Sequence, residues 1–372
     1  MARFLGLCAL ALWLGASTAR FAASQTFTYT TIDAPGARNT TVLGVNDRSQ
    51  IVGAFDNGPT DYHGFLQSGG QFTTIDVPGG TLTTPAGINN KGQIVGGYML
   101  NDRLHGFLLD RGQFTTIDPP GAVNGSALSI NDAGQIAGQY VDAAGVQRGF
   151  LLTHGRFVII DVTGSAEGGL FGINRSGRVV GRYGDALGRL HGFRLEASGA
   201  GVTLDVTPGT FTQPNAISER GEIVGEASGS RGFLLSFGRV ALVNVTGSQS
   251  TLPIGINRRG QIVGRYVDGT PGNFREHGFI ATPDGLTVDV SMNPSADGTR
   301  VPETAFIVDG DLAVWTMGTG QEILRNGVQA ANGYGSRILY RLGEVYVLGD
   351  DNTWWRWTSG TWTSAGANEP GR

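Results

Sequence analysis

Short apolar runs separated by polar turns follow one another along most of the chain. The runs are rich in Val, Ile, Phe and Thr, and the turns between them are rich in Gly, Asn and Asp. Residues 135–140 form one such run, and residues 131–134 form the turn before it. After Ser24, no stretch repeats its apolar positions at the helical interval. The pattern therefore predicts an all-β protein made of short strands joined by tight turns.

One unit of this kind recurs six times. Each copy begins with a string such as Gly-Ile-Asn, continues through Gln-Ile-Val-Gly and then His-Gly-Phe or Arg-Gly-Phe, and closes on a strand such as Thr-Ile-Asp. The polar residue after the first strand recurs every 39 to 44 residues, at Asn46, Asn89, Asn131, Asn174, Ser218 and Asn257. Each copy predicts four short strands, which is the content of one β-propeller blade.

The closing strand indicates that these blades form a ring. It occurs once more at residues 27–33, ahead of the first complete copy. A spare N-terminal strand of this kind can pair into the last blade and fasten the ring. The sequence thus predicts a β-propeller-like ring of about six four-stranded repeats over residues 25–290, and a stack of open hairpins is the alternative.

The order of Gly-Ile-Asn, Gly-Gln-Ile-Val-Gly and His-Gly-Phe resembles the repeat of the bacterial extracellular HAF-repeat family, named after a His-Ala-Phe signature. The resemblance extends from Phe27 to Val290, and Gly stands where the signature has Ala. It implies export and tandem β-repeats, and it implies no established activity.

Residues 1–24 have the pattern of a secretory signal peptide, in which Arg3 precedes an apolar run over residues 4–14 and a series of small residues. That run is shorter than a membrane-spanning helix needs, so we expect no integral membrane segment in the mature chain. Cys8, the only cysteine, lies in this segment, and the exported chain would hold no thiol for a disulfide or a zinc site. These features predict a secreted or periplasmic bacterial protein.

The last part of the chain has a different composition. Residues 291–304 are polar and predict a linker, and residues 305–372 hold every tryptophan that follows the signal segment. Several short apolar runs there predict a small Trp-rich β module, for which a seventh blade is the alternative.

Three tryptophans of this module are the candidate ligand-binding residues. A two-residue hairpin turn at residues 359–360 would place Trp357 opposite Trp362, with Trp355 on the same face of the sheet. Indole rings gathered on one face can stack on sugar rings, so Trp355, Trp357 and Trp362 predict a carbohydrate contact. The alternative is that they form the core of the module.

Two recurring polar side chains raise the question of catalysis or metal binding. One repeat position holds His63, His105, His191 and His277, with Arg148 and Arg231 in the other copies. The closing strands end at Asp33, Asp76, Asp118, Asp161, Asp205 and Asp289, with Asn244 in the fifth copy. Because both sets recur with the fold, we interpret the histidines as structural hydrogen-bonding groups and the carboxylates as turn-stabilising groups bonded to nearby backbone N–H groups. We therefore predict no catalytic residue, no metal site and no cofactor.

Charge narrows the choice of partner. Charged residues make up 16% of the chain, its net charge is −4, and no basic stripe is present, so nucleic acid is an unsuitable partner. The leading hypothesis is a secreted, non-catalytic binding protein that contacts polysaccharide or another envelope protein. The alternatives are a polysaccharide lyase or hydrolase with a propeller active site, for which Glu222 and Glu226 are the residues that break the repeat, and a structural envelope component.

Overall fold

The computed structural model describes residues 27–370 apart from several short stretches. These stretches are residues 59–60, 161–166, 207–210, 229–230, 237–238, 271, 284–299, 302–306, 309–313, 318–320, 326–327, 342–343, 350, 359–360 and 369. The predicted signal peptide lies outside the described residues. The chain divides into two compact units, one made chiefly of residues up to 285 and the other chiefly of residues 286–372.

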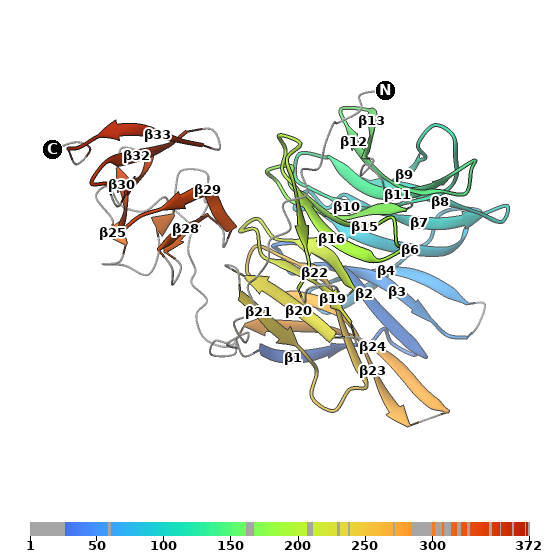
Figure 1. The fold of residues 1–372 in the computed structure, drawn as a ribbon. Helices are drawn as coiled ribbons and strands as arrows, with labels where there is room; N and C mark the ends of the chain where they lie inside the picture. The colour runs from blue at the N-terminus through green and yellow to red at the C-terminus, as the bar shows by residue number, and fades with distance from the viewer. Residues whose placement is uncertain are drawn as a thin grey trace. The chain divides into compact units, whose positions relative to one another are not determined.

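The first unit consists of six four-stranded antiparallel sheets (Figure 1). The first blade contains β2 (Asn39–Val45), β3 (Ile51–Asp56), β4 (Tyr62–Ser68) and β5 (Gln71–Ile75). The second contains β6 (Thr81–Ile88), β7 (Ile94–Leu100), β8 (Arg103–Asp110) and β9 (Gln113–Ile117). The third contains β10 (Ala122–Ile130), β11 (Ile136–Asp142), β12 (Gln147–Thr153) and β13 (Arg156–Ile160). The next two are β14 (Gly168–Ile173), β15 (Val179–Gly184), β16 (Leu190–Leu195) and β17 (Gly201–Leu204); and β18 (Thr212–Ile217), β19 (Ile223–Ala227), β20 (Arg231–Ser236) and β21 (Arg239–Val243).

The sixth blade closes the ring. It contains β22 (Ser250–Ile256), β23 (Ile262–Thr270) and β24 (Asn273–Pro283), and its outer strand is β1 (Phe27–Ile32) from the start of the described chain. Figure 1 shows the blue β1 beside the orange β24, and the two strands pair in register from Phe27 opposite Pro283 to Ile32 opposite Gly278. The first strands of successive blades contact one another around a complete circle, and β2 contacts β22. The predicted six-bladed ring is confirmed, and the open stack of hairpins is wrong.

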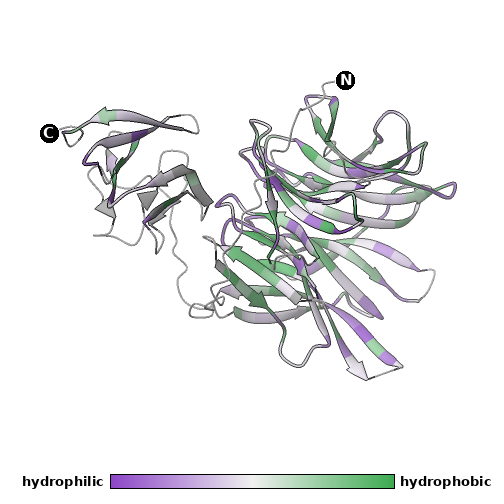
Figure 2. Cartoon of the chain, in the orientation of Figure 1, coloured by the Kyte–Doolittle hydropathy of each residue, from purple (hydrophilic) through white to green (hydrophobic). Residues whose placement is uncertain are grey.

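The recurring glycines and phenylalanines of the sequence meet inside each blade. The Phe of the third strand lies on the Gly of the second strand: a Cβ on Gly53 would lie 3.0 Å from the Phe65 ring and 2.1 Å from the carbonyl oxygen of Thr41. All six of these rings are buried, namely Phe65, Phe107, Phe150, Phe193, Phe233 and Phe279. Figure 2 shows the result, with apolar residues along the strands and hydrophilic ones at outer hairpins such as β23–β24.

The turn between the first two strands of each blade needs a left-handed backbone. Five copies place a glycine there with φ between 75° and 81°, at Gly92, Gly134, Gly177, Gly221 and Gly260. The first copy has Ser49 with φ 57°. Gly reaches this region without a steric penalty, which explains its recurrence in the repeat.

The second unit forms two sheets of its own. One has the order β25 (Arg300–Val301), β30 (Arg337–Arg341), β31 (Glu344–Leu348), β32 (Trp354–Thr358) and β33 (Thr361–Gly366). The other has the order β26 (Ile307–Val308), β27 (Val314–Met317), β28 (Glu322–Arg325) and β29 (Val328–Tyr334). Because six blades already complete the ring, the alternative of a seventh blade is wrong. The predicted linker is also too long, since Arg300 and Val301 pair with β30.

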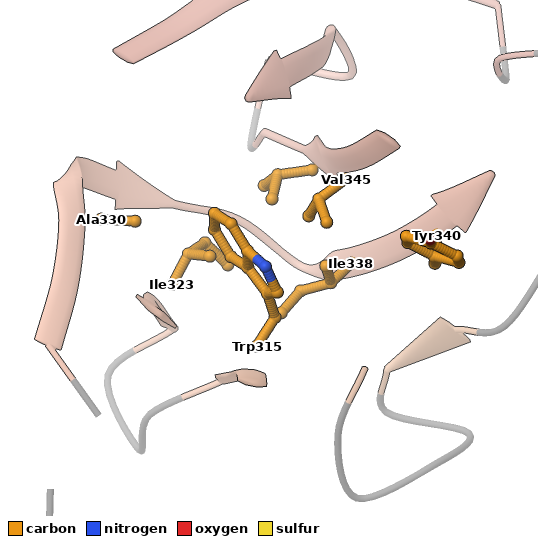
Figure 3. Close-up of a cluster of buried hydrophobic side chains, with 7 residues drawn as sticks. Trp315, Ile323, Ala330, Ile338, Tyr340 and Val345 are labelled. Carbon is orange, nitrogen blue, oxygen red and sulfur yellow. The ribbon is translucent and has the colours of Figure 1, made fainter. Parts of the chain in front are cut away.

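The centre of the second unit is an apolar cluster around Trp315. This indole is fully buried and lies among side chains that include Ile323, Ile338 and Val345 (Figure 3). Strands β28 and β29 contribute Ile323 and Ala330 to this cluster. In the described part of the chain there is no helix, and therefore none that is long and apolar enough to cross a membrane.

Candidate functional site

The recurring histidines link the third and fourth strands within their blades. In four blades the ring Nδ1 lies within hydrogen-bond distance of the Asp that ends the closing strand: His63–Asp76 at 2.8 Å, His105–Asp118 at 2.7 Å, His191–Asp205 at 3.0 Å and His277–Asp33 at 2.9 Å. The predicted structural role of the histidines is confirmed. The aspartates share a histidine of the adjacent strand as their partner, which the sequence did not predict. Asp118 also accepts the backbone N–H of Gly106 at 3.4 Å, so the predicted bond to nearby backbone is present at this residue. Asp161 and Asp289 lie outside the described residues.

The three candidate tryptophans of the second unit do not share one environment. Trp357 lies opposite Trp362 across the hairpin, as the sequence predicted. Their rings meet edge to face at 4.9 Å, and both also meet the buried Trp315, at 5.2 and 5.7 Å. Trp362 Nε1 donates a hydrogen bond to the carbonyl oxygen of Ala330 at 2.7 Å. Trp355 is half-buried and is not part of this cluster of indoles. A carbohydrate contact through these three residues stays a prediction.

A belt of asparagines surrounds the axis of the propeller. Asn46 Nδ2 donates to the backbone oxygen of Asn89 at 3.1 Å, and the same bond runs from Asn89 to Asn131 and from Asn131 to Asn174. Asn174 Nδ2 donates to the backbone oxygen of Ser218 at 3.2 Å, and Asn257 Nδ2 donates to the backbone oxygen of Asn46 at 3.0 Å. The Asn of the repeat is thus a structural residue that ties its blade to the next in five of the six blades, and the fifth blade has Ser218 at this position.

The six blades enclose a cavity of about 340 Å³ at the centre of the ring. It is lined by the first strand of all six blades, so its wall consists of equivalent positions of the repeat. At one of these positions five blades carry an apolar residue, and together these residues form an apolar band of Leu43, Ala86, Leu128, Phe171 and Ile254. The fifth blade has Asn215 at this position. A cavity of this volume is at the lower end of the range found for small-molecule sites.

One mouth of the cavity is polar. It lies at the turns after the first strands, where Asp47, Asn90, Asp132, Glu219 and Arg258 are in the lining. Arg258 is exposed, so the cavity reaches the surface at this end. Arg175 holds the equivalent position in the fourth blade and is exposed as well.

Hydrogen bonds fix the carboxylates of this mouth. Asn90 Nδ2 donates to Asp47 at 2.8 Å and to Asp132 at 3.0 Å. Both carboxylate oxygens of Glu219 accept the backbone N–H of Arg175, at 2.9 and 3.1 Å. Burial raises the pKa of the Glu219 carboxyl, the charges of Asp132 and Asp47 raise it further, and the backbone hydrogen bond from Arg175 opposes the shift.

Sequence reasoning did not select these mouth residues, although a signal was present. They occupy the position directly after the Asn of the repeat, where the six copies carry three carboxylates, one amide and two arginines. That variation contrasts with the near constancy of the two positions before it, which hold Val or Ile and then Asn in five of the six copies. The two residues selected instead, Glu222 and Glu226, are absent from the cavity lining. Glu222 is buried and accepts a hydrogen bond from Ser236 Oγ at 3.3 Å.

In the part of the chain that the structure describes, no group of three or more His, Cys, Asp or Glu side chains has an arrangement that could hold a metal ion.

The fold and the site define a six-bladed β-propeller with an axial cavity that has an apolar band and one polar mouth. No family model matches the chain, and no curated protein matches it in sequence. Among solved structures it is similar to a gluconolactonase of Xanthomonas campestris, with 11% identity over 70% of this chain and 92% of that chain and a TM-score of 0.46. TolB of Acinetobacter baumannii shares 18% identity over 67% of this chain and 64% of that chain, with a TM-score of 0.41. The SapL1 lectin, solved with alpha methyl fucoside, shares 10% identity over 90% of this chain and 98% of that chain, with a TM-score of 0.34.

Proposed function

We propose that this chain is an exported binding protein that holds a small, mainly apolar ligand in the axial cavity of its propeller. The observation that carries the proposal is the cavity itself, with its apolar band of Leu43, Ala86, Leu128, Phe171 and Ile254. A concave site that combines apolar side chains with polar groups is the usual construction of a small-molecule site. Here Thr84, Ser126 and the belt asparagines add polar groups to the lining beside the apolar band. The export part of the proposal is supported by the signal-like pattern of residues 1–24 and by the resemblance of the repeat to the extracellular HAF repeat.

A binding role is favoured over a polysaccharide lyase or hydrolase for a geometric reason. An enzyme of that kind needs carboxylates in a cleft that admits a chain of sugars. The carboxylates found together in this propeller lie at the mouth of a cavity on the axis, which suits a small molecule better than a polymer. The carbohydrate contact that the sequence suggested for the second unit is not needed for this proposal.

The ligand test uses an uncharged apolar dye, N-phenyl-1-naphthylamine, whose emission rises in apolar surroundings. Titration into the purified protein should give saturable enhancement with one site per chain. Leu128→Trp and Ala86→Phe add bulk to the cavity wall and should each abolish the enhancement while far-ultraviolet circular dichroism stays unchanged. Leu242→Trp is the matched control, because Leu242 is half exposed and is outside the cavity lining. If the dye binds the two cavity variants as well as it binds the control, the cavity is not the site.

The export part has a test of its own. Residues 1–24 joined to a reporter enzyme that is active only outside the cytoplasm should give activity in a bacterial host. The same fusion with a charged residue placed in the apolar run of residues 4–14 should give none, because the run then no longer forms a continuous apolar segment.

A further inference from the structure

The cavity wall is not equally apolar on all sides. Leu43, Leu128 and Ile254 represent the apolar band, and Asn215 replaces such a residue in the fifth blade. The Asn215 side chain is 8% exposed, and its Nδ2 donates to the backbone oxygen of Pro253 at 2.9 Å. Its Oδ1 accepts from the side-chain amide of Gln213 at 2.9 Å, so the amide is held in one orientation.

The same blade departs from the repeat at one more position along the axis. Ser218 stands where the other five blades have the belt asparagine, and Glu219 follows it at the mouth. One side of the cavity wall is therefore polar from the level of the apolar band to the mouth, where it ends at a carboxylate. Its residues are Asn215, Ser218 and Glu219.

At the mouth position the six blades carry three carboxylates and two arginines. The next position of the same turns holds four cationic residues, none of which is in the cavity lining, namely Arg48, Lys91, Arg220 and Arg259. Among the residues that the structure describes, the carboxylates of Asp47, Asp132 and Glu219 accept hydrogen bonds only from backbone N–H groups and from Asn90. The two exposed arginines at the mouth position each donate a backbone N–H to one of these carboxylates, Arg175 to Glu219 and Arg258 to Asp47.

We propose that the axial cavity selects a small organic cation. Its apolar body would lie against the band that contains Leu43, Leu128 and Ile254, and its ammonium group would lie at the carboxylates of Asp47, Asp132 and Glu219. This inference rests on the proposed function, since it names the class of ligand for the same cavity. The physical reason is that a cation relieves the repulsion among three carboxylates, while the apolar band takes a hydrocarbon body out of water.

The direction of the Glu219 shift adds a pH signature. Burial and the charges of Asp132 and Asp47 raise the pKa of this carboxyl, so part of its charge is lost at a higher pH than usual. A bound cation favours the ionised form and should release protons on binding. The affinity for a cation should therefore increase as the pH rises through the pKa of Glu219.

The experiment compares three molecules that differ in one terminal group: 3-phenylpropylammonium, 3-phenylpropanol and 3-phenylpropionate. Isothermal titration of the purified protein should give the tightest binding for the ammonium compound, about tenfold tighter than for the alcohol. The carboxylate compound should bind most weakly. Glu219→Gln and, as a second variant, Asp132→Asn should reduce the affinity for the ammonium compound towards that of the alcohol and leave the affinity for the alcohol unchanged.

The matched control is Asp102→Asn, which makes the same change in net charge at the exposed hairpin between β7 and β8. It should keep the preference for the ammonium compound. Equal binding of ammonium compound and alcohol, or a preference that survives both carboxylate variants, would overturn the choice of a cation and leave the cavity as a site for neutral ligands. Failure of the dye to distinguish the cavity variants from Leu242→Trp would instead overturn the proposed function itself.

Discussion

Tyr98 shows how one side chain joins two others in the repeat. Its ring lies on the ring of His105, with centroids 5.5 Å apart, and its hydroxyl lies 3.1 Å from the Thr116 hydroxyl. Two further blades repeat this arrangement, with Tyr183 beside His191 and Thr203, and Tyr266 beside His277 and Thr31. The first blade has Phe55 on His63 instead, so it keeps the ring contact and lacks the hydroxyl.

The first prediction completes this arrangement in the first blade. Thr74 is the equivalent of Thr116, so Phe55→Tyr should add a tyrosine–threonine hydrogen bond and raise the free energy of unfolding by about 1 kcal/mol. Urea unfolding followed by circular dichroism measures the change. In a Thr74→Val background the same substitution should give no gain, because the partner hydroxyl is gone. A gain of equal size in that background would show that the hydrogen bond is not its cause.

The second prediction concerns pH. Hydrogen bonds to Asp76 and then Asp61 raise the pKa of His63 above its ordinary value, and burial opposes them. A raised folded-state pKa means that this contribution to stability is complete below about pH 6.5, the value for an unfolded chain, and is lost as the pH rises through the higher folded-state value. The difference in unfolding free energy between the wild type and His63→Gln should therefore be larger at about pH 6 than at about pH 8.5.

The control for the pH experiment is His154→Gln. His154 lies in a turn, where its ring is bound to the Thr153 hydroxyl and not to a carboxylate pair. The effect of this substitution should change little over the same pH interval. If both variants showed the same pH dependence, the two aspartates would not be the origin of the His63 effect.

At the scale of the strand, packing between blades explains the glycine that recurs in the His-Gly-Phe and Arg-Gly-Phe strings. A Cβ on Gly64 would lie 2.5 Å from Cδ of Pro85 in the next blade, and one on Gly278 would lie 2.6 Å from a methyl of Val42. Real Cβ atoms do not approach other atoms this closely, so the third strand of one blade and the first strand of the next come together only over a glycine. The recurring glycine therefore permits the close approach of the blades.

The third prediction concerns the hairpin of β32 and β33. Trp357→Ala removes a ring that packs against both Trp315 and Trp362, and it should lower the stability of the second unit by about 3 kcal/mol. All described tryptophans lie in this unit, so their emission reports its unfolding alone. Trp355→Ala is the matched control and should cost less, because Trp355 lies outside the indole cluster. A larger loss for Trp355→Ala would contradict the core role of Trp357.

At the scale of the whole ring, the N-terminal strand β1 closes the propeller by completing the sixth blade. Because β1 is the outer strand of the sixth blade, a chain that begins at Ala34 would leave β24 with an unpaired edge and would lose the buried side chain of Ile32. The fourth prediction is that this truncation lowers the urea midpoint of the propeller and causes self-association in gel filtration. A chain that begins at Gln25 keeps β1 and is the control. Equal urea midpoints for the two chains would show that the stability of the ring does not depend on β1.

The sequence by itself determined the blade and the number of blades. The spacing of the belt position from Asn46 to Asn257, the turn glycines and the spare strand at residues 27–33 are local or repetitive features, and each acts through short-range backbone geometry. The hairpin register that places Trp357 opposite Trp362 follows from turn length in the same way. These features were predictable because neighbours in sequence are also neighbours in the blade.

Only the tertiary structure decided which residues face the axis together. Asp47, Asp132 and Glu219 come from three blades and lie far apart in sequence, and closure of the ring brings them to one mouth. In the same way, Trp315 of one sheet meets Trp357 and Trp362 of the other sheet, a contact between strands that lie far apart in the sequence. A periodic pattern states which side of a strand is buried, but contacts between distant strands depend on how the chain closes on itself. For that reason the candidate site lay at positions where the repeat varies, and its geometry became visible only in the folded ring.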